Sequence, residues 1–239
     1  MNIFKTKKTD NFKRFYLFGV EIFSYKIKNK KGNKYFSTHP NNKVIVHPDI
    51  DCNLKIYGEC NEVIIKKGLH VSCIVYGNHN KIYIGETCHA HNITLLIGTP
   101  DTSVQNCSFS IGDNCSSNGL FCLLLDCDSS VSIGHDCLFS DNIELWASDT
   151  HAIYDNNGDV LNLGKSIKIG NHVWIGRYVK ILKNTEIQDN SVVGMGSIVT
   201  KKFTETNCVI TGNPAKIVKR NINWDVRRPD EQASFLRQA

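Results

Sequence analysis

One histidine of this chain, His151, could act as a proton acceptor in catalysis. His151 follows Asp149 and Thr150 at the start of a stretch rich in Asp, Asn and Gly that runs to Lys165. An imidazole titrates near neutral pH, so it can take a proton from a hydroxyl group as that group attacks an electrophile. Such a base works best when an acceptor holds its second ring nitrogen, and Asp149 is the nearest carboxylate.

Other assignments stay open for these two residues. Asp155, Glu144 or a main-chain carbonyl would also serve as the acceptor for the imidazole. The alternative for His151 is a polar loop residue without a catalytic task. The alternative for Asp149 is a turn former, which is a common role for Asp.

A short internal repeat supplies the elements that would position this histidine. Units of six residues begin with an aliphatic residue, and equivalent residues recur after 18 positions, as in Ile169 and Ile187 or Ile175 and Val193. Three units make one turn of a triangular coil, in which the aliphatic residues point inward and Gly, Asn and Asp occupy the corners. The pattern predicts an all-β solenoid of stacked turns, from which residues 149–165 leave as an extruded loop.

The ten cysteines are predicted to be structural. In such a coil the fourth residue after the aliphatic one also faces inward, and this position carries Cys88, Cys115, Cys137 and Val173. A ladder of small side chains in register indicates packing rather than metal ligation. Residues 1–10 are polar and lack the apolar core of a signal peptide, so we expect a cytoplasmic protein with reduced thiols.

Patterning and charge divide the chain into a central domain and two basic ends. We expect an N-terminal extension at 1–43, a solenoid domain at 44–215 and a C-terminal tail at 216–239. The net charge of +5 suits an anionic partner, although a solvated surface explains it equally well. The aromatic residues within 12–25 would suit peripheral contact with a membrane. We expect no nucleic-acid partner.

Three motifs in order resemble the hexapeptide-repeat acyltransferases. They are Val173-Trp174-Ile175-Gly176, the segment 193–201 with sequence VGMGSIVTK, and Gly212-Asn213-Pro214-Ala215-Lys216. The resemblance covers roughly residues 81–219, and in type the chain is similar to bacterial capsule and sialic-acid O-acetyltransferases. It implies a left-handed parallel β-helix, a homotrimer with active sites between subunits, and acetyl-CoA as co-substrate. The left hand is an exception to the usual crossover rule.

The resemblance also implies roles for individual residues. His151 precedes Trp174 by 23 positions, close to the family spacing between the histidine that deprotonates the acceptor and this tryptophan. Trp174 would line the acceptor and thioester end of the cleft, unless it only packs at a subunit contact. The phosphates of acetyl-CoA need cations and main-chain donors, which the resemblance places on Gly176, Arg177, Met195, Gly196, Ser197, Thr200, Lys201, Lys216 and Lys219. Arg177 and Met195 replace the small residues common in the family, so main-chain hydrogen bonds are the expected contacts there.

We therefore expect an O-acetyltransferase without a metal, in which His151 is the general base. The basic and aromatic N-terminal segment favours a bacterial capsular polysaccharide as acceptor, such as polysialic acid, or its precursor. An N-acetyltransferase of an amino sugar would use the same base, but the GxGxxG element of a nucleotide-binding half is absent. A zinc protein of the γ-carbonic-anhydrase type would need a set such as His135, His151 and His172. A non-catalytic scaffold would not need the intact motifs.

Overall fold

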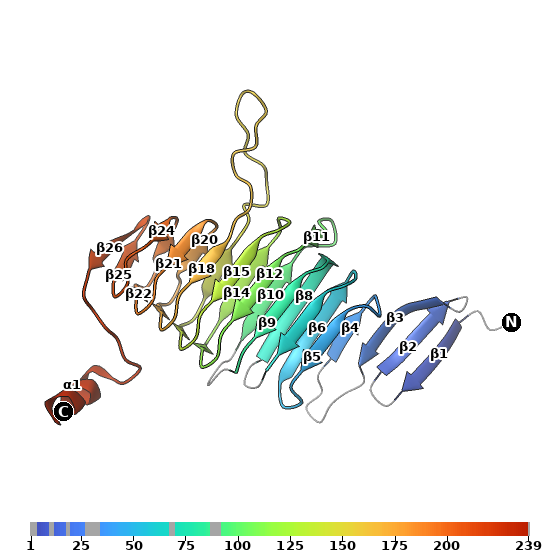
Figure 1. Ribbon diagram of the computed structural model, residues 1–239, viewed down its shortest axis with the longest axis horizontal. Helices are drawn as coiled ribbons and strands as arrows, with labels where there is room; N and C mark the ends of the chain where they lie inside the picture. The colour runs from blue at the N-terminus through green and yellow to red at the C-terminus, as the bar shows by residue number, and fades with distance from the viewer. Residues whose placement is uncertain are drawn as a thin grey trace.

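The chain forms an elongated parallel β-helix, from which one long loop projects (Figure 1). The computed structural model describes residues 4–9, 12–17, 20–26, 34–66, 70–86 and 92–238, and the side chains before Phe36 are not described. The membrane contact predicted for residues 12–25 therefore concerns side chains outside this description, as does the inward position predicted for Cys88. Within the described chain, no helix is both long and apolar enough to cross a membrane.

Three sheets form the three faces of the coil, and the chain passes from one face to the next as it winds along the coil. The first face contains, in spatial order, β4 (Lys34–Ser37), β6 (Asp51–Tyr57), β8 (His70–Asn78), β10 (Ile93–Ile97), β14 (Leu120–Leu124), β17 (Ile143–Trp146), β20 (Lys180–Leu182) and β23 (Ile198–Val199). Antiparallel strands extend this face beyond β4, and a short strand pairs with β8; these are β1 (Phe4–Thr9), β2 (Phe12–Leu17), β3 (Val20–Lys26) and β11 (Val104–Gln105).

The other two faces are built in the same way. The second face contains β5 (Lys43–Val46), β7 (Glu62–Ile65), β9 (Lys81–Ile84), β12 (Ser108–Ile111), β15 (Ser130–Ile133), β18 (Ile167–Ile169), β21 (Thr185–Ile187) and β24 (Lys202–Phe203). The third face contains β13 (Ser116–Ser117), β16 (Leu138–Phe139), β19 (Trp174–Ile175), β22 (Val192–Val193), β25 (Val209–Gly212) and β26 (Ala215–Lys219). β25 and β26 pair antiparallel and end the coil. The helix α1 (Pro229–Gln238) follows, and the predicted divisions at 43 and 215 stay predictions.

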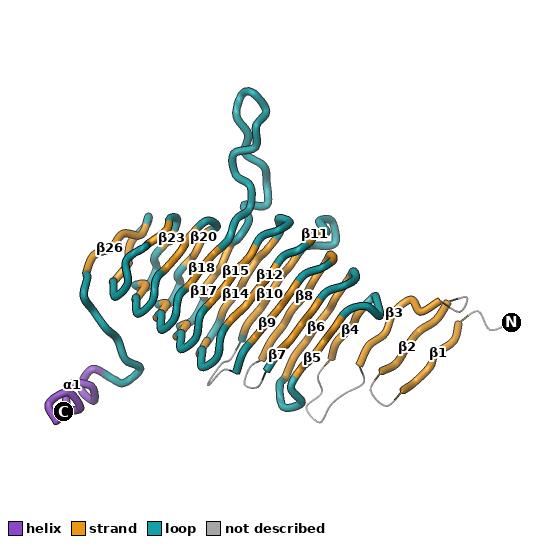
Figure 2. Tube along the Cα trace, viewed as in Figure 1, coloured by secondary structure: helices purple, strands orange, loops and turns teal. Residues whose placement is uncertain are grey.

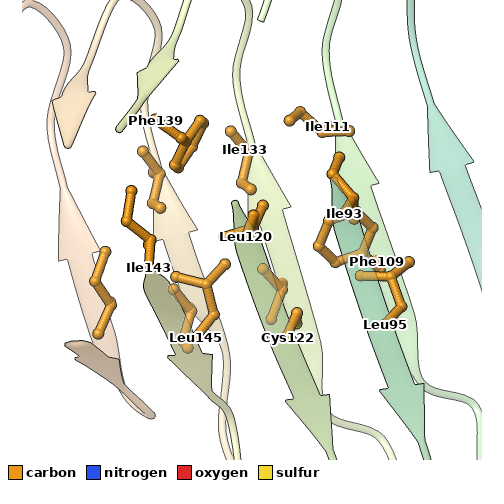
Figure 3. Packing of buried hydrophobic residues seen from close by; sticks show 14 of the residues in the cluster. Ile93, Leu95, Phe109, Ile111, Leu120, Cys122, Ile133, Phe139, Ile143 and Leu145 are labelled. Carbon is orange, nitrogen blue, oxygen red and sulfur yellow. The ribbon is translucent and has the colours of Figure 1, made fainter. Parts of the chain in front are cut away.

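The aliphatic residues of the repeat stack inside the coil, as predicted. Ile84, Ile111, Ile133 and Ile169 are buried and occupy one register across the second face. Figure 3 shows such side chains filling the space between the faces. Burying each aliphatic side chain stabilises the fold by about 1.5–3 kcal/mol, so the stacked turns hold one another in place.

One corner of the coil is built from residues in the left-handed backbone region. Between the second and third faces, Asn114, Asp136, His172, Asn190 and Asn207 have φ angles of 52–58°. Asn and Asp tolerate this region better than most residues because their short side chains bond locally. The predicted use of Asn and Asp at tight corners is therefore confirmed.

The described cysteines are free, and most belong to the core. Cys115 and Cys137 are buried in neighbouring turns, and their thiols lie 3.2 Å from the main-chain oxygens of Gly134 and Gly170. Burial raises the pKa of Cys73 to about 12, which suppresses the thiolate. Only Cys60 and Cys127 are exposed among the nine described cysteines.

This distribution predicts the thiol reactivity of the folded chain. With Ellman's reagent, Cys60 and Cys127 should react quickly, whereas Cys73, Cys122 and Cys137 should react only after denaturant is added. Peptide mapping of the labelled sites gives the measurement. Rapid labelling of Cys137 in the folded protein would contradict the packed ladder.

Candidate active site

The loop that carries His151 leaves the coil between β17 and β18, at the corner of the first and second faces (Figures 1 and 2). An isolated bridge between Tyr154 and Val160 narrows the loop. The main-chain N–H of His151 donates to the carbonyl oxygen of Asp149 at 2.8 Å. The imidazole is exposed, and no described group bonds to its ring nitrogens. Its proton-accepting nitrogen is therefore open to a ligand.

Asp149 is engaged with two other residues in this structure. Its Oδ2 lies 2.6 Å from Nζ of Lys183 and accepts a hydrogen bond from Nδ2 of Asn162 at 2.8 Å. Partial burial raises the pKa of Asp149, but the hydrogen bonds from Lys183 and Asn162 and the charge of Lys183 outweigh it, so the pKa lies below its ordinary value. The role of Asp149 as acceptor for the imidazole stays a prediction.

The two other carboxylates considered for that role also have partners. Asp155 accepts hydrogen bonds from the main-chain N–H groups of Asn157 and Asp159, at 2.8 and 3.0 Å, and so shapes the tip of the loop. Glu144 accepts from Lys180 and from the Trp146 indole, both at 2.7 Å, and the hydrogen bond from Lys180 lowers the pKa of Glu144. Both carboxylates contribute to local structure.

Trp174 lies on the third face and is 38% exposed. Its Nε1–H points at Oγ of Ser140 at 3.4 Å, and its ring centroid lies 6.1 Å from that of Trp224. Trp224 stacks on His172 at 4.2 Å and donates from Nε1 to the His172 carbonyl oxygen at 2.8 Å. Sequence reasoning missed Trp224, although a lone tryptophan in a polar tail is a signal of such a contact.

His151 and Trp174 do not meet within one protomer. The chain passes from β17 on the first face, through the loop, to β18 on the second face and β19 on the third. In a three-sided coil, the third face lies opposite the corner between the first and second. The proposed base and the proposed cleft tryptophan therefore face different directions.

Several residues predicted to bind the coenzyme gather at the corner between the third and first faces. The N–H of Gly196 donates to the Arg177 carbonyl oxygen at 2.8 Å, so these two turns are adjacent. A Cβ on Gly176 would lie 2.8 Å from the Met195 nitrogen, so only glycine fits without a shift. Gly196 has φ +72° and open space beside it. The main-chain N–H groups of Arg177 and Met195 bond to no group in the described chain.

The remaining predicted coenzyme residues are distributed over other positions. The Ser197 hydroxyl is buried and donates to the Gly194 carbonyl oxygen at 2.6 Å, so its side chain supports the turn. Thr200 and Lys201 follow β23 at the corner of the first and second faces, while Lys216 and Lys219 lie on β26. All four are exposed, and the two pairs lie on different parts of the coil.

A groove of about 540 Å³ begins next to the corner that carries Arg177 and extends over the preceding turns of the coil. Asp141 in this groove pairs with Arg177 at 3.2 Å. Phe121 and Trp146 form an aromatic wall, with ring centroids 6.0 Å apart. The wall is surrounded by hydrogen-bonding groups, namely Asn92, Thr94, Asn118, Asp141, Asn142 and Glu144. Aromatic area beside amides and carboxylates is suited to a hydroxyl-rich ligand.

No group of three or more His, Cys, Asp or Glu residues in the described chain could hold a metal ion. Two of the histidines considered for zinc have other partners. Nδ1 of His135 lies 2.5 Å from Oδ2 of Asp136. Nδ1 of His172 lies 3.1 Å from Oδ1 of Asn190, and the His172 ring stacks on Trp224.

Comparisons with known proteins agree with this architecture. A family model described as bacterial transferase hexapeptide (six repeats) matches residues 166–201. A polysialic acid O-acetyltransferase of Escherichia coli O1:K1 / APEC is 38% identical over 96 residues, which are 40% of this chain and 31% of that protein. The alignment thus spans about a third of that curated relative.

Two solved structures are similar over most of their length. The polySia specific acetyltransferase NeuO is 27% identical, with a TM-score of 0.68 over 85% of this chain and 95% of that one. The polysialic acid O-acetyltransferase OatWY is 32% identical, with a TM-score of 0.61 over 80% and 91%. These neighbours confirm the predicted left-handed parallel β-helix.

Proposed function

This chain belongs to the hexapeptide-repeat family of bacterial acyltransferases, and on that premise we propose that it transfers an acetyl group from acetyl-CoA to a carbohydrate hydroxyl. The acceptor in this proposal is a capsular polysaccharide, and polysialic acid is the first candidate because NeuO and OatWY, the two similar solved structures, are polysialic acid acetyltransferases. The observation that carries the proposal is the continuous corner formed by Gly176, Arg177 and Gly196 with the groove beyond Asp141.

The residues present suit acetyl-CoA as the donor. Gly176 and Gly196 leave room for close approach, and the free N–H groups of Arg177 and Met195 offer hydrogen bonds to an amide or an oxyanion. The exposed cations Lys201, Lys216 and Lys219 would meet phosphates. The bound thioester supplies an activated acetyl group, so the protein needs to add only positioning, a base and donors.

In the proposed reaction, Nε2 or Nδ1 of His151 accepts the proton of the acceptor hydroxyl as its oxygen attacks the thioester carbonyl carbon. A C–O bond forms, and the tetrahedral adduct collapses with cleavage of the C–S bond. The leaving CoA thiolate then takes up the proton from the imidazolium. The products are an O-acetyl ester and CoA, and the histidine is regenerated.

We further propose that three copies of the chain assemble, and that each active site lies between two of them. Within one protomer His151 and Trp174 face different directions, so a complete site requires a neighbour. The loop also exposes large apolar residues away from the body of the coil; Ile153, Tyr154, Leu161 and Leu163 are 58–68% exposed. Such a patch on a projecting loop favours burial against a second copy.

The acceptor would lie in the groove beside Phe121 and Trp146. This groove shares a corner with Arg177, so donor and acceptor would meet end to end along the coil. A polymer could continue along the first face beyond the groove. We propose action in the cytoplasm, which the free state of the nine described cysteines supports.

A panel of acceptors tests the proposal. The purified chain is incubated with acetyl-CoA and polysialic acid, neutral polysaccharides, sialic acid or amino sugars, and released CoA is followed by thiol detection. We expect release with polysialic acid above the rate of hydrolysis without acceptor. Release with amino sugars alone would indicate N-acetylation, and release with none of them would contradict acetyl transfer to carbohydrate.

A further inference from the structure

The neck of the extruded loop is closed by three side chains, Asp149, Asn162 and Lys183, which we name the neck clamp. Asp149 and Asn162 lie on the two arms of the loop, and Lys183 directly follows β20 in the next turn of the coil. Nζ of Lys183 is paired with Oδ2 of Asp149 at 2.6 Å and donates to the Asn162 carbonyl oxygen. Lys183 is only 15% exposed, so this ion pair is less screened than a surface pair.

Asn162 connects the clamp to the main chain of His151. Its Nδ2 donates to the His151 carbonyl oxygen at 2.9 Å as well as to Asp149 at 2.8 Å. Its Oδ1 accepts from the N–H of Ile153 at 2.7 Å. The main chain that follows the His151 Cα is therefore fixed to a residue that is itself held by Lys183.

The rest of the loop has few contacts with the body of the coil. Figure 2 shows it standing away from the stacked turns. The hydrogen bonds of Asp155 at its tip are made to residues 157 and 159 of the same loop. The place and direction of His151 relative to the coil therefore depend on the neck.

We propose that Lys183 is a positioning residue for His151, and that Asp149 serves the reaction through Lys183 rather than by bonding to the imidazole. This inference rests on the proposed function, because it requires His151 to be the base. The ammonium of Lys183 compensates the charge of Asp149 and ties both arms of the loop to the coil. Without it the base would lose its fixed distance to the thioester, and a misplacement of this kind lowers the rate more than the affinity.

The first test compares Lys183→Ala, Lys183→Arg and a matched control. We expect Lys183→Ala to lower kcat by about 10- to 100-fold with little change in the KM for acetyl-CoA. Lys183→Arg keeps the charge and should recover most of the lost rate. Lys43→Ala removes an ion pair of equal length, 2.6 Å to Glu62, far from the loop, and should keep the wild-type rate.

A double-mutant cycle separates the two roles of Asp149. If Asp149 acts through Lys183, Asp149→Asn should lower kcat in the wild-type background and have little further effect in Lys183→Ala. If Asp149 holds the imidazole directly, the losses should add.

The fall of kcat at acid pH, the acid limb of the kcat–pH profile, gives a second readout. A carboxylate next to an imidazolium raises the histidine pKa, so direct contact predicts that Asp149→Asn moves the limb to lower pH, whereas the clamp predicts an unmoved limb.

Each outcome decides between defined alternatives. Near-wild-type kcat in Lys183→Ala, additive losses or a shifted limb would overturn the neck clamp while leaving acetyl transfer intact. No turnover by the wild-type chain would instead overturn the proposed function. Should Lys183→Ala fail to fold, as judged by thermal unfolding, Asn162→Ala replaces it in the same cycle and must show the same loss of kcat.

Discussion

Replacing His151 with alanine is expected to lower kcat by about 10²- to 10⁴-fold, the usual contribution of a general base. The reason is that a neutral hydroxyl is a poor nucleophile, and His151 is the only histidine among the described residues of the loop, 149–165. Because the side chain is exposed and makes no hydrogen bond in the described structure, its loss should leave the fold unchanged. The affinity for CoA should also persist, since the predicted coenzyme residues lie elsewhere on the coil.

The measurement is steady-state kinetics together with CoA binding by calorimetry and thermal unfolding. His47→Ala is the control, because His47 is a partly exposed histidine near the N-terminal end of the coil, away from the loop, and its Nδ1 lies 3.8 Å from a carboxylate oxygen of Asp49. It should retain the wild-type rate. Near-wild-type turnover by His151→Ala would remove this residue from the base role.

Mixing two inactive variants is expected to restore activity. His151→Ala lacks the base, and Trp174→Ala lacks the proposed cleft tryptophan. If each site combines the loop of one protomer with the third face of the next, co-assembled trimers contain some sites with both wild-type residues. With equal and random mixing, about a quarter of the sites are complete, so about a quarter of the wild-type rate should return.

The mixed assemblies must be formed by co-expression or by refolding together, with separately purified variants as the background. The double variant His151→Ala/Trp174→Ala co-expressed with itself is the control and should stay inactive. A mixture that is no more active than its components would place both residues in one protomer's site, or would show that Trp174 is dispensable. The first result would contradict a site shared between subunits, and the second would remove Trp174 from the proposed site.

Much of the fold could be predicted from the sequence because particular residue types recur at fixed positions of the repeat. An aliphatic residue at each sixth position and a recurrence of 18 dictate which side chains stack, and Ile169 with Ile187 and Ile175 with Val193 do so in one register. The extruded loop was visible as an interruption of the pattern between Asp149 and Lys165. The handedness came from the family resemblance and not from the period.

The candidate site was less accessible to sequence reasoning. Lys183 is one lysine among many, and only the structure shows that it reaches Asp149 on a loop more than 30 residues earlier in the chain. Asn162 likewise looks like a polar loop residue until its bonds to His151 and Ile153 are seen. The aromatic wall of Phe121 and Trp146 joins two turns whose separation in sequence follows no motif. Such contacts depend on side-chain directions that the repeat does not encode.

Analysis of the acetylated product tests the central claim most directly. Polysialic acid is incubated with the purified chain and acetyl-CoA labelled with ¹³C in the acetyl group, and the polymer is examined by NMR before and after mild alkali. The account predicts a labelled acetyl ester on the polymer that alkali removes, formed in equal amount to free CoA and absent with His151→Ala. An unlabelled polymer, or a label that survives alkali as an amide, would contradict it.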